Sequence, residues 1–414
     1  MTDSLRKGPA RARPKRRFTP PPESASWPRP WVLLRSASFH PFIYRRMVDG
    51  ASGDARPGDV VRVYDRRGEV FGSGFYNPRS RITLRMLLHG ERAVDSVFLD
   101  ELLRQAVSLR RDVLRLDAVT NAYRVLHAEG DGLSGLVVDR YDDVLAVEVF
   151  AYGPFRQLDT LLPRLHELCG TSRDVVRVDT AAARLEGFTI AETRGAGELV
   201  RSVKIAENGV RFGVRFDEGH KTGFFCDQRD NRRRLAGLVA GRSLLDVCCY
   251  TGGFALAAMA AGNARDATGV DLDERAIETA RHNANLNQVR VKWVHADAFV
   301  YMRQMEANER RWEALVLDPP KLIATRDDYG EGTRKYLDLN KLALRLLAPG
   351  GLFLTCSCSG LLPESEHDKI VAAAARHAGR RLQLLERSGA APDHPVSPQC
   401  PESAYLKALW YRVL

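Results

Sequence analysis

Apolar runs of strand length alternate with helical patterns through the C-terminal part of the chain. After each strand-like run, apolar residues recur at the spacing of one helix face. Strands that alternate with helices of this length are typical of a parallel sheet covered by helices. The sequence therefore predicts a doubly wound α/β domain over residues 206–414, closed by "SAYLKALWYRVL" as an edge strand. The five parallel strands are expected at "SLLDVCC", "DATGVDLD", "VKWVHAD", "EALVLDPP" and "LFLTCSCS".

The upstream part of the chain predicts two smaller domains. Residues 31–92 carry short alternating runs separated by Gly, Asp and Pro, a pattern typical of a small β-barrel. A helical pattern over 94–117 is followed by paired strands and another helix, so residues 93–205 predict an α+β domain. Residues 1–30 are basic and rich in proline, and they predict a disordered tail.

The charge of the chain favours a polyanionic partner. Its 414 residues include 62 Lys and Arg against 52 Asp and Glu, a formal net charge of +10. Such a balance is common in proteins that bind nucleic acid, and the arginine fork suits phosphate. The sequence shows no apolar run long enough for a membrane span and no apolar core of a secretory signal. We therefore expect a cytoplasmic protein with no membrane partner.

The cysteine pattern argues against a metal centre. Seven cysteines without regular spacing predict reduced thiols rather than a disulfide framework. Cys356 and Cys358 are closer in sequence than the usual pairs of zinc sites, and no second pair or paired His accompanies them. We therefore expect no metal.

The first strand-to-helix turn, "DVCCYTGGFA", is the expected ligand-binding turn of the doubly wound domain. Gly252 and Gly253 would let the backbone approach a ligand, but the Gly-x-Gly-x-x-Gly pattern of dinucleotide-binding turns is missing. Asp271, Asp297 and Asp318 end the next three strands.

These acidic strand ends indicate the cofactor. Asp271 is placed to bind both hydroxyls of a ribose, and Asp297 to accept from the exocyclic amine of adenine. Each acid alone is more often a helix cap or a loop residue. Together with the glycine turn, they predict an adenosine cofactor without a pyrophosphate, which is S-adenosylmethionine.

The segment "LDPPK" predicts the substrate side of the site. Pro319 and Pro320 make a rigid strand exit that would hold the Asp318 carboxylate against a planar ring. The prolines would also offer an apolar surface to a flipped base. A plain loop start is the alternative interpretation.

Cys356 and Cys358 are candidates for nucleophilic catalysis. Carbon 5 of cytosine becomes nucleophilic after a thiolate has added to carbon 6. The thiolate needs a nearby positive group, for which Lys321 and the sulfonium of the cofactor are candidates. Both cysteines point to the same face of a regular strand, so alternation does not choose between them. Cys358 is nearer the carboxyl end, where ligands bind, and Cys356 is expected to be a buried packing residue.

Five motifs together resemble the RlmI-type large-subunit ribosomal RNA cytosine-5 methyltransferases. They are "KTGFFCDQRDNR", "YTGGFA", "GVDLD", "LDPPK" and "LTCSCSG". The resemblance spans residues 31–414. It implies an N-terminal PUA domain, a central α+β domain and a C-terminal Rossmann-like class I methyltransferase domain. It also implies that Cys358 is the nucleophile and that Asp318 holds the cytosine.

The resemblance adds the segment from Lys221 to Arg229 to the expected cofactor site, as a segment that closes over the cofactor. Cys356 and the thiol pair before Tyr250 depart from the family pattern. The complete predicted cofactor site comprises Lys221, Thr222, Gly223, Phe224, Asp227, Gln228, Arg229, Tyr250, Thr251, Gly252, Gly253, Asp271, Asp297, Asp318 and Pro319.

Other functions fit parts of the sequence. Enzymes that modify guanine share the PUA domain and the "DPP" segment, and Cys358 would then only pack. A non-catalytic RNA-binding protein could keep this fold, and a protein methyltransferase could share the cofactor site. The expected partner is ribosomal RNA of the 23S type, and a homodimer is left open.

Overall fold

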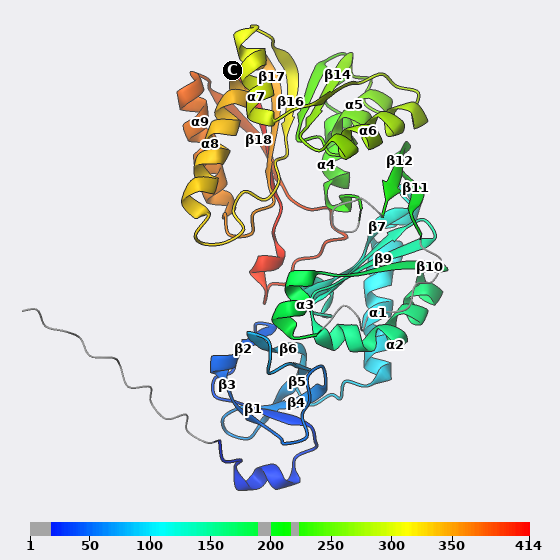
Figure 1. Ribbon diagram of the computed structural model, residues 1–414, viewed down its shortest axis with the longest axis vertical. Coiled ribbons are helices and arrows are strands. Elements are labelled where there is room, and N and C mark those ends of the chain that lie inside the picture. The colour runs from blue at the N-terminus through cyan, green and yellow to red at the C-terminus, as the bar shows by residue number, and fades with distance from the viewer. Residues whose placement is uncertain (1–17, 189–199, 217–222) are drawn as a thin grey trace, which may run out of the picture. The chain divides into compact units, whose positions relative to one another are not determined.

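The computed structural model describes residues 18–188, 200–216 and 223–414. The chain divides into two compact units, Met1–Ala93 and Val94–Leu414. This division lies next to the boundary expected at residue 92. Figure 1 labels most elements of both units.

The first unit is built on one six-stranded sheet with the order β2-β6-β5-β4-β1-β3. β1 pairs in parallel with β4, and the remaining neighbours pair antiparallel. Val32, Leu34, Ile43, Val63 and Leu84 lie in its core and are fully buried. The strands are β1 (Trp31–Leu34), β2 (Phe42–Tyr44), β3 (Val48–Ala51), β4 (Val60–Tyr64), β5 (Val70–Tyr76) and β6 (Ile82–His89).

Ordered structure in the first unit begins before Trp31, which differs from the disordered tail expected over residues 1–30. A short 3-10 helix spans Pro22–Ser26. Trp27 stacks on Tyr64 with ring centroids 3.8 Å apart and meets Trp31 edge to face. Burial of these aromatic faces stabilises the segment. Its proline-rich sequence did not reveal this, because the stacking partner Tyr64 lies far along the chain.

The second unit begins with a four-stranded sheet of order β10-β9-β8-β7 and two long helices. A two-stranded hairpin, β11 with β12, follows it. The elements are α1 (Ser96–Ser108), β7 (Ala122–His127), β8 (Leu136–Tyr141), β9 (Val144–Val149), α2 (Tyr152–Cys169), β10 (Arg173–Val178), α3 (Thr180–Glu186), β11 (Ser202–Glu207) and β12 (Val210–Arg215).

The boundary predicted at residue 206 falls inside β11, so it does not separate two domains. The hairpin residues Ile205 and Phe212 share one hydrophobic cluster with Tyr141 of β8 and Leu256 further along the chain. Because this core is continuous, the central sheet and the C-terminal sheet belong to one compact unit.

The second sheet of this unit has seven strands with the order β15-β14-β13-β16-β17-β19-β18. β13 to β17 run parallel, as the alternation of strands and helices predicts, and the doubly wound fold is confirmed. The strands are β13 (Ser243–Val247), β14 (Asp266–Asp271), β15 (Lys292–His295), β16 (Trp312–Leu317), β17 (Leu347–Ser357), β18 (Leu382–Ser388) and β19 (Lys407–Val413).

The last strand is not an edge strand, contrary to the expectation for residues 403–414. β19 lies between β17 and β18 and pairs antiparallel with both. Six of its seven residues are buried, so both faces are covered. The sequence analysis missed β18, which forms the edge. Four of its seven residues are polar, and all seven are only partly buried or exposed.

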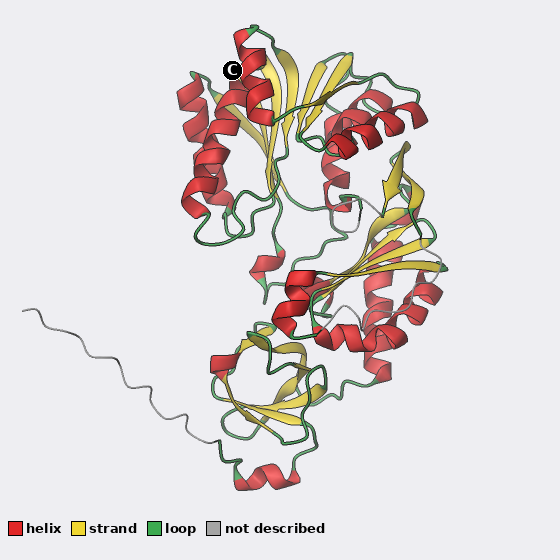
Figure 2. Ribbon diagram, viewed as in Figure 1, coloured by secondary structure: helices red, strands yellow, loops and turns green. Residues whose placement is uncertain are grey.

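Helices cover both faces of the seven-stranded sheet (Figure 2). On one face, α8 and α9 contribute Leu339 and Val371 to a hydrophobic core. On the other face, α4 and α5 contribute Leu235 and Phe254. The helices are α4 (Arg229–Ala236), α5 (Gly253–Ala260), α6 (Glu274–Leu286), α7 (Ala298–Ala307), α8 (Tyr329–Arg345) and α9 (Glu364–Ala378).

Membrane-spanning helices are not found among the residues that the structure describes, since none of the helices there is both long and apolar enough.

Candidate active site

The parallel strands β13, β14, β16 and β17 have their carboxyl ends on the same side of the seven-stranded sheet, where ligands bind in such folds. The turn after β13 is fixed to the end of β14 by Asp271. One carboxylate oxygen of Asp271 accepts from the Tyr250 backbone N–H at 2.8 Å. The other accepts from the Asp273 N–H at 2.9 Å. An ionised carboxylate has about four acceptor positions, so Asp271 keeps capacity for ribose hydroxyls.

Gly252 is required by the shape of this turn. Its φ is +86°, in the left-handed region, and a Cβ there would lie 2.4 Å from the Trp293 indole. A second clash would arise at Gly269 of β14, where a Cβ would lie 2.3 Å from the same indole. The tight approach of Trp293 therefore accounts for Gly252 without any ligand.

Asp246 in the middle of β13 was missed by the sequence analysis. Its side chain is fully buried and accepts from the Ala255 N–H in the first turn of α5 at 3.0 Å. Burial, opposed by the hydrogen bond from the Ala255 N–H and reinforced by the nearby Asp318 and Asp271 charges, raises the pKa of Asp246 to about 8. Its other oxygen has no hydrogen-bond partner among the described residues. The available signal was a lone acid inside an apolar strand.

Asp297 follows β15 and caps α7, since its carboxylate accepts from the Val300 N–H at 3.0 Å. The structure thus shows the helix-cap role that was the alternative for this residue. Its side chain is partly exposed at the same sheet edge as Asp271, so the contact with adenine stays a prediction.

The segment that follows residue 222 lies against the glycine turn. The Tyr250 hydroxyl donates to the Gly223 carbonyl at 3.2 Å, and the Phe225 ring meets Tyr250 edge to face at 5.0 Å. A surface depression is lined by Gly223, Tyr250, Thr251 and Asp273, among others. The structure therefore brings three predicted cofactor residues together. Lys221 and Thr222 lie outside the described residues.

Phe224 does not join this group, contrary to the expectation. Its side chain is buried in the cluster shared with Phe212, under the Arg232 guanidinium at 4.7 Å. Phe225 is the aromatic residue that faces Tyr250. Two adjacent aromatic residues must point to different sides, and the motif alone did not say which one turns inward.

Arg229 does not reach the cofactor side either. Its side chain is 1% exposed, and its guanidinium donates to both carboxylate oxygens of Asp393, at 2.8 and 3.0 Å. The third nitrogen of the guanidinium, Nε, donates to the Asp230 carboxylate at 3.3 Å. All three nitrogens are thus engaged with protein carboxylates, which gives Arg229 a structural role.

Asp227 and Gln228 are both buried, and each hydrogen-bonds to a residue far along the chain. The Gln228 amide donates to Asp318 at 2.9 Å, which orients that carboxylate. Asp227 is buried and accepts from the Tyr405 hydroxyl. Its other oxygen has no partner among the described residues.

Asp318 directly follows β16, and its N–H donates to the Val247 carbonyl at the end of β13 at 3.2 Å. The side chain is partly exposed at this edge, Pro319 is buried, and Lys321 is exposed to solvent. The strand exit therefore leaves the Asp318 carboxylate partly accessible.

The two thiols of "TCSCS" have different surroundings. Cys356, inside β17, is fully buried in a hydrophobic core, whereas Cys358 lies just past the strand end and is partly exposed. Thr355 pairs with Leu317 in the neighbouring strand, so Cys358 and Asp318 lie at adjacent strand ends.

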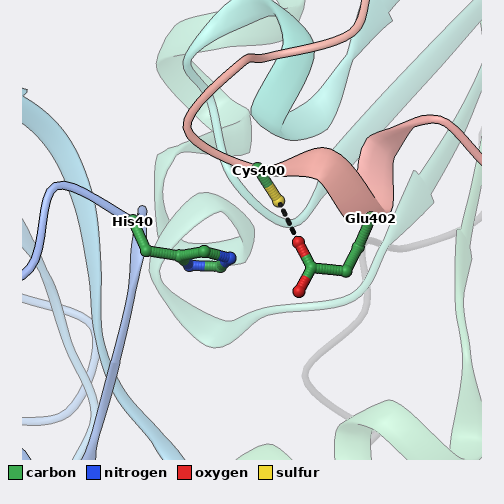
Figure 3. A group of neighbouring side chains, drawn as sticks. All are labelled: His40, Cys400 and Glu402. Atoms are coloured by element: carbon green, nitrogen blue, oxygen red, sulfur yellow. Dashed lines mark hydrogen bonds between the residues drawn. The ribbon is translucent and has the colours of Figure 1, made fainter.

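Burial keeps the other thiols protonated at neutral pH. It raises the pKa of Cys169 to about 11. It raises the pKa of Cys400 to about 12, with the Glu129 and Glu402 charges adding to the effect; Cys400 donates to Glu402 at 3.6 Å (Figure 3). Burial also raises the pKa values of Cys226, Cys248, Cys249 and Cys356 well above the ordinary range.

A larger hollow lies away from the strand ends. It is lined by the β11–β12 hairpin and by α4 and α5, including the buried ion pair of Arg232 with Glu207. None of the predicted cofactor residues lines it.

The strand order and the acidic strand ends define the S-adenosylmethionine-dependent methyltransferase class. A family model of S-adenosylmethionine-dependent methyltransferases matches residues 127–412, and a PUA-like domain model matches residues 35–88. Two solved structures described as proposed methyltransferases share the fold. SMU.776 in complex with SAH has a TM-score of 0.75 at 20% identity and covers 90% of this chain and 96% of its own. One from Streptococcus mutans has a TM-score of 0.74 at 19% identity, covering 92% and 99%.

Curated relatives define the family more closely. Ribosomal RNA large subunit methyltransferase I of Pseudoalteromonas atlantica is 35% identical over 379 residues, 91% of this chain and 95% of that protein. The protein of the same name from Shewanella frigidimarina is 37% identical over 380 residues, 90% and 95% of the two chains. The chain belongs to the ribosomal RNA large subunit methyltransferase I family, which confirms the resemblance predicted from the motifs and the S-adenosylmethionine cofactor.

Replacement of Asp271 by asparagine should weaken S-adenosylmethionine binding. The amide would remove the charged acceptor for the ribose and present a donor to a backbone N–H, a loss of roughly 1.5–3 kcal/mol. We expect the Kd measured by calorimetry to rise about 10- to 150-fold. Asp266→Asn, at the exposed opposite end of β14, is the control and should bind like the wild type. Equal affinities for Asp271→Asn and wild type would rule out the ribose contact.

Proposed function

We propose that this protein transfers a methyl group from S-adenosylmethionine to carbon 5 of a cytosine in large-subunit ribosomal RNA, with Cys358 as the nucleophile. One observation carries the proposal: a partly exposed thiol and an oriented carboxylate follow two adjacent parallel strands. The neighbouring thiol Cys356 is fully buried and therefore cannot meet a base.

The chemistry requires one covalent bond to the protein. When bound, S-adenosylmethionine supplies the methyl group. The Cys358 thiolate bonds to carbon 6 of the cytosine, and the electron pair of the 5,6 double bond makes carbon 5 nucleophilic. Once carbon 5 carries the methyl group, its proton passes to solvent. The electron pair of the broken C5–H bond restores the 5,6 double bond, and the pair of the bond between carbon 6 and sulfur returns to the sulfur. The thiolate is then restored.

The strand-exit residues have proposed roles in this reaction. Asp318 holds the cytosine, and the hydrogen bond from Gln228 fixes the direction of its carboxylate. Pro319 is buried at the strand exit, and Lys321, two residues further on, is exposed to solvent.

The proposed cofactor site is narrower than the sequence analysis predicted. It retains the residues around the glycine turn and the two acidic strand ends, because these gather at one sheet edge. Phe224 and Arg229 are left out, since their side chains point into the protein. The proposed residues are Gly223, Tyr250, Thr251, Gly252, Gly253, Asp271 and Asp297.

Ribosomal RNA is the proposed substrate on two grounds. The curated relatives are named for the large-subunit RNA and match over nearly the whole chain. The PUA-like domain and the net charge of +10 suit an RNA partner. We expect cytoplasmic ribosomal RNA of the 23S type.

The test is the identity of the methylated nucleoside. The protein is incubated with S-adenosylmethionine labelled in the methyl group and with large-subunit ribosomal RNA, and the RNA is then digested to nucleosides. We expect the label in 5-methylcytidine, and none in small-subunit RNA as the control. Label in a methylated guanosine would overturn the proposed base, and absence of label with normal cofactor binding would indicate a non-catalytic protein.

A further inference from the structure

A lysine is buried beside the proposed nucleophile. Lys407 begins β19, and the strand register pairs it with Ser357, the residue before Cys358. Its ammonium donates to the carbonyl of Ser359, the residue after Cys358, at 2.6 Å, and to the Tyr405 carbonyl at 2.8 Å. Lys407 therefore contacts the backbone on both sides of the sulfur. Lys407 is only 6% exposed.

A buried ammonium is costly unless charge compensates for it. Burial lowers the pKa of Lys407 to about 8; the Cys358 and Glu364 charges oppose this, and the Lys321 charge adds to it. Two carbonyls satisfy two of the three N–H donors but carry no formal charge. Glu364 is partly exposed and already faces Arg387 at 3.3 Å. The Cys358 sulfur is therefore the counter-charge that the surroundings of Lys407 favour.

Two buried side chains on the neighbouring helices, His367 and Tyr336, are neutral. His367 of α9 is fully buried, and burial, together with the Lys407 charge, lowers its pKa to about 4. The Tyr336 hydroxyl of α8 hydrogen-bonds to the hydroxyls of Ser357 and Ser359, at 2.9 and 3.0 Å. These bonds fix the backbone on either side of Cys358. A neutral histidine and three hydroxyls leave Lys407 as the buried positive charge there.

We propose that Lys407 is a positioning residue for Cys358. The Lys407 ammonium stabilises the Cys358 thiolate, and its hydrogen bond to the Ser359 carbonyl holds the backbone that follows Cys358. The inference rests on the proposed function. It assigns the positive group that the thiolate needs to Lys407 rather than to Lys321. A buried charge acts more strongly than an exposed one, which water screens.

The test measures the reactivity of the Cys358 thiol directly. Iodoacetamide alkylation is followed from pH 6 to pH 10 without RNA or cofactor, and modification of Cys358 is quantified by mass spectrometry. Lys407→Gln keeps N–H donors but removes the charge, and it should slow Cys358 alkylation about tenfold at pH 7. The difference should shrink above pH 8, where the wild-type lysine loses its proton.

Two further variants separate charge from structure. Lys407→Arg keeps a positive charge and should retain most of the wild-type rate. Lys292→Gln, on β15 at the opposite edge of the sheet, removes a lysine remote from Cys358 and should leave the profile unchanged. S-adenosylmethionine affinity and urea unfolding of each variant report whether the fold is intact.

The outcomes distinguish this inference from the proposed function. Wild-type alkylation profiles in Lys407→Gln would overturn the role of Lys407 even if Cys358 is the nucleophile. An equal slowing in Lys407→Arg and Lys407→Gln would also overturn it, since the charge would then not matter. Full methylation by Cys358→Ala would overturn the proposed function, whatever Lys407 does to alkylation. If Lys407→Gln does not fold, the profile of Lys407→Arg against Lys321→Gln decides which lysine carries the effect.

Discussion

Wild-type protein will form a covalent adduct with an RNA that carries 5-fluorocytosine at the target position, and Cys358→Ala will form none. Fluorine replaces the proton that must leave carbon 5, so the bond between sulfur and carbon 6 cannot break after methyl transfer. Cys358→Ala should also lose methylation by a factor on the order of 10⁴, while its affinity for S-adenosylmethionine stays at the wild-type value. Denaturing gels detect the adduct, and calorimetry measures the affinity.

Cys356→Ala is the matched control for this experiment. The two cysteines belong to the same strand and differ in burial, since Cys356 is 0% exposed inside the core. We expect Cys356→Ala to form the adduct and to lose about 1 kcal/mol of stability from the small cavity that it leaves. Adducts that require Cys356 and not Cys358 would exchange the two roles. Normal methylation by the double variant would exclude covalent catalysis and favour the guanine alternative.

Asp393→Asn will destabilise the second unit by about 3–5 kcal/mol, because it removes the buried charged partner of the Arg229 guanidinium. Both side chains are at most 1% exposed, and Asp393 also accepts from the Arg124 backbone N–H at 2.9 Å. Although burial alone would raise it, His394 and Arg229 hold the pKa of Asp393 well below its ordinary range. The stabilisation is therefore present above pH 4 and is lost as the pH falls below that value. Urea unfolding at pH 7 measures the difference.

Asp230→Asn is the control, since it removes the other acidic partner of the same arginine. Asp230 is 39% exposed and lies 3.3 Å from Arg229, so we expect a change of about 0–1 kcal/mol. Similar losses in the two variants would show that burial does not set the strength of these pairs.

The sequence predicted those features of the fold that depend on neighbouring residues. The alternation of strand-length apolar runs with helical patterns predicted the parallel strands and their helices, because side-chain periodicity follows local backbone geometry. One of these helices is α6, Glu274–Leu286, which follows β14. The acids Asp271, Asp297 and Asp318 could be found because a strand end can be read locally, and parallel strands bring such ends to one edge.

The expectations that failed concern residues whose contact partners are distant in the sequence. β19 was expected at the edge, but the pairing of β18 outside it is a long-range event. Arg229 was expected at the cofactor because the family resemblance places it in the segment that closes over the cofactor, yet its partner Asp393 lies 164 residues away. Phe224 and Phe225 are equivalent in sequence, and the Phe212 side chain of β12 decides which one is buried.

By itself, the sequence determined the class of the fold, the family, the cofactor and the two candidate thiols. Only the tertiary structure decided which thiol reaches solvent, since strand alternation puts both on one face and the end of β17 separates a buried Cys356 from a partly exposed Cys358. It also brought Lys407, the first residue of β19, to the backbone on both sides of Cys358. Local pattern fixes the secondary structure of each segment, whereas the electrostatic surroundings of a side chain depend on non-local packing.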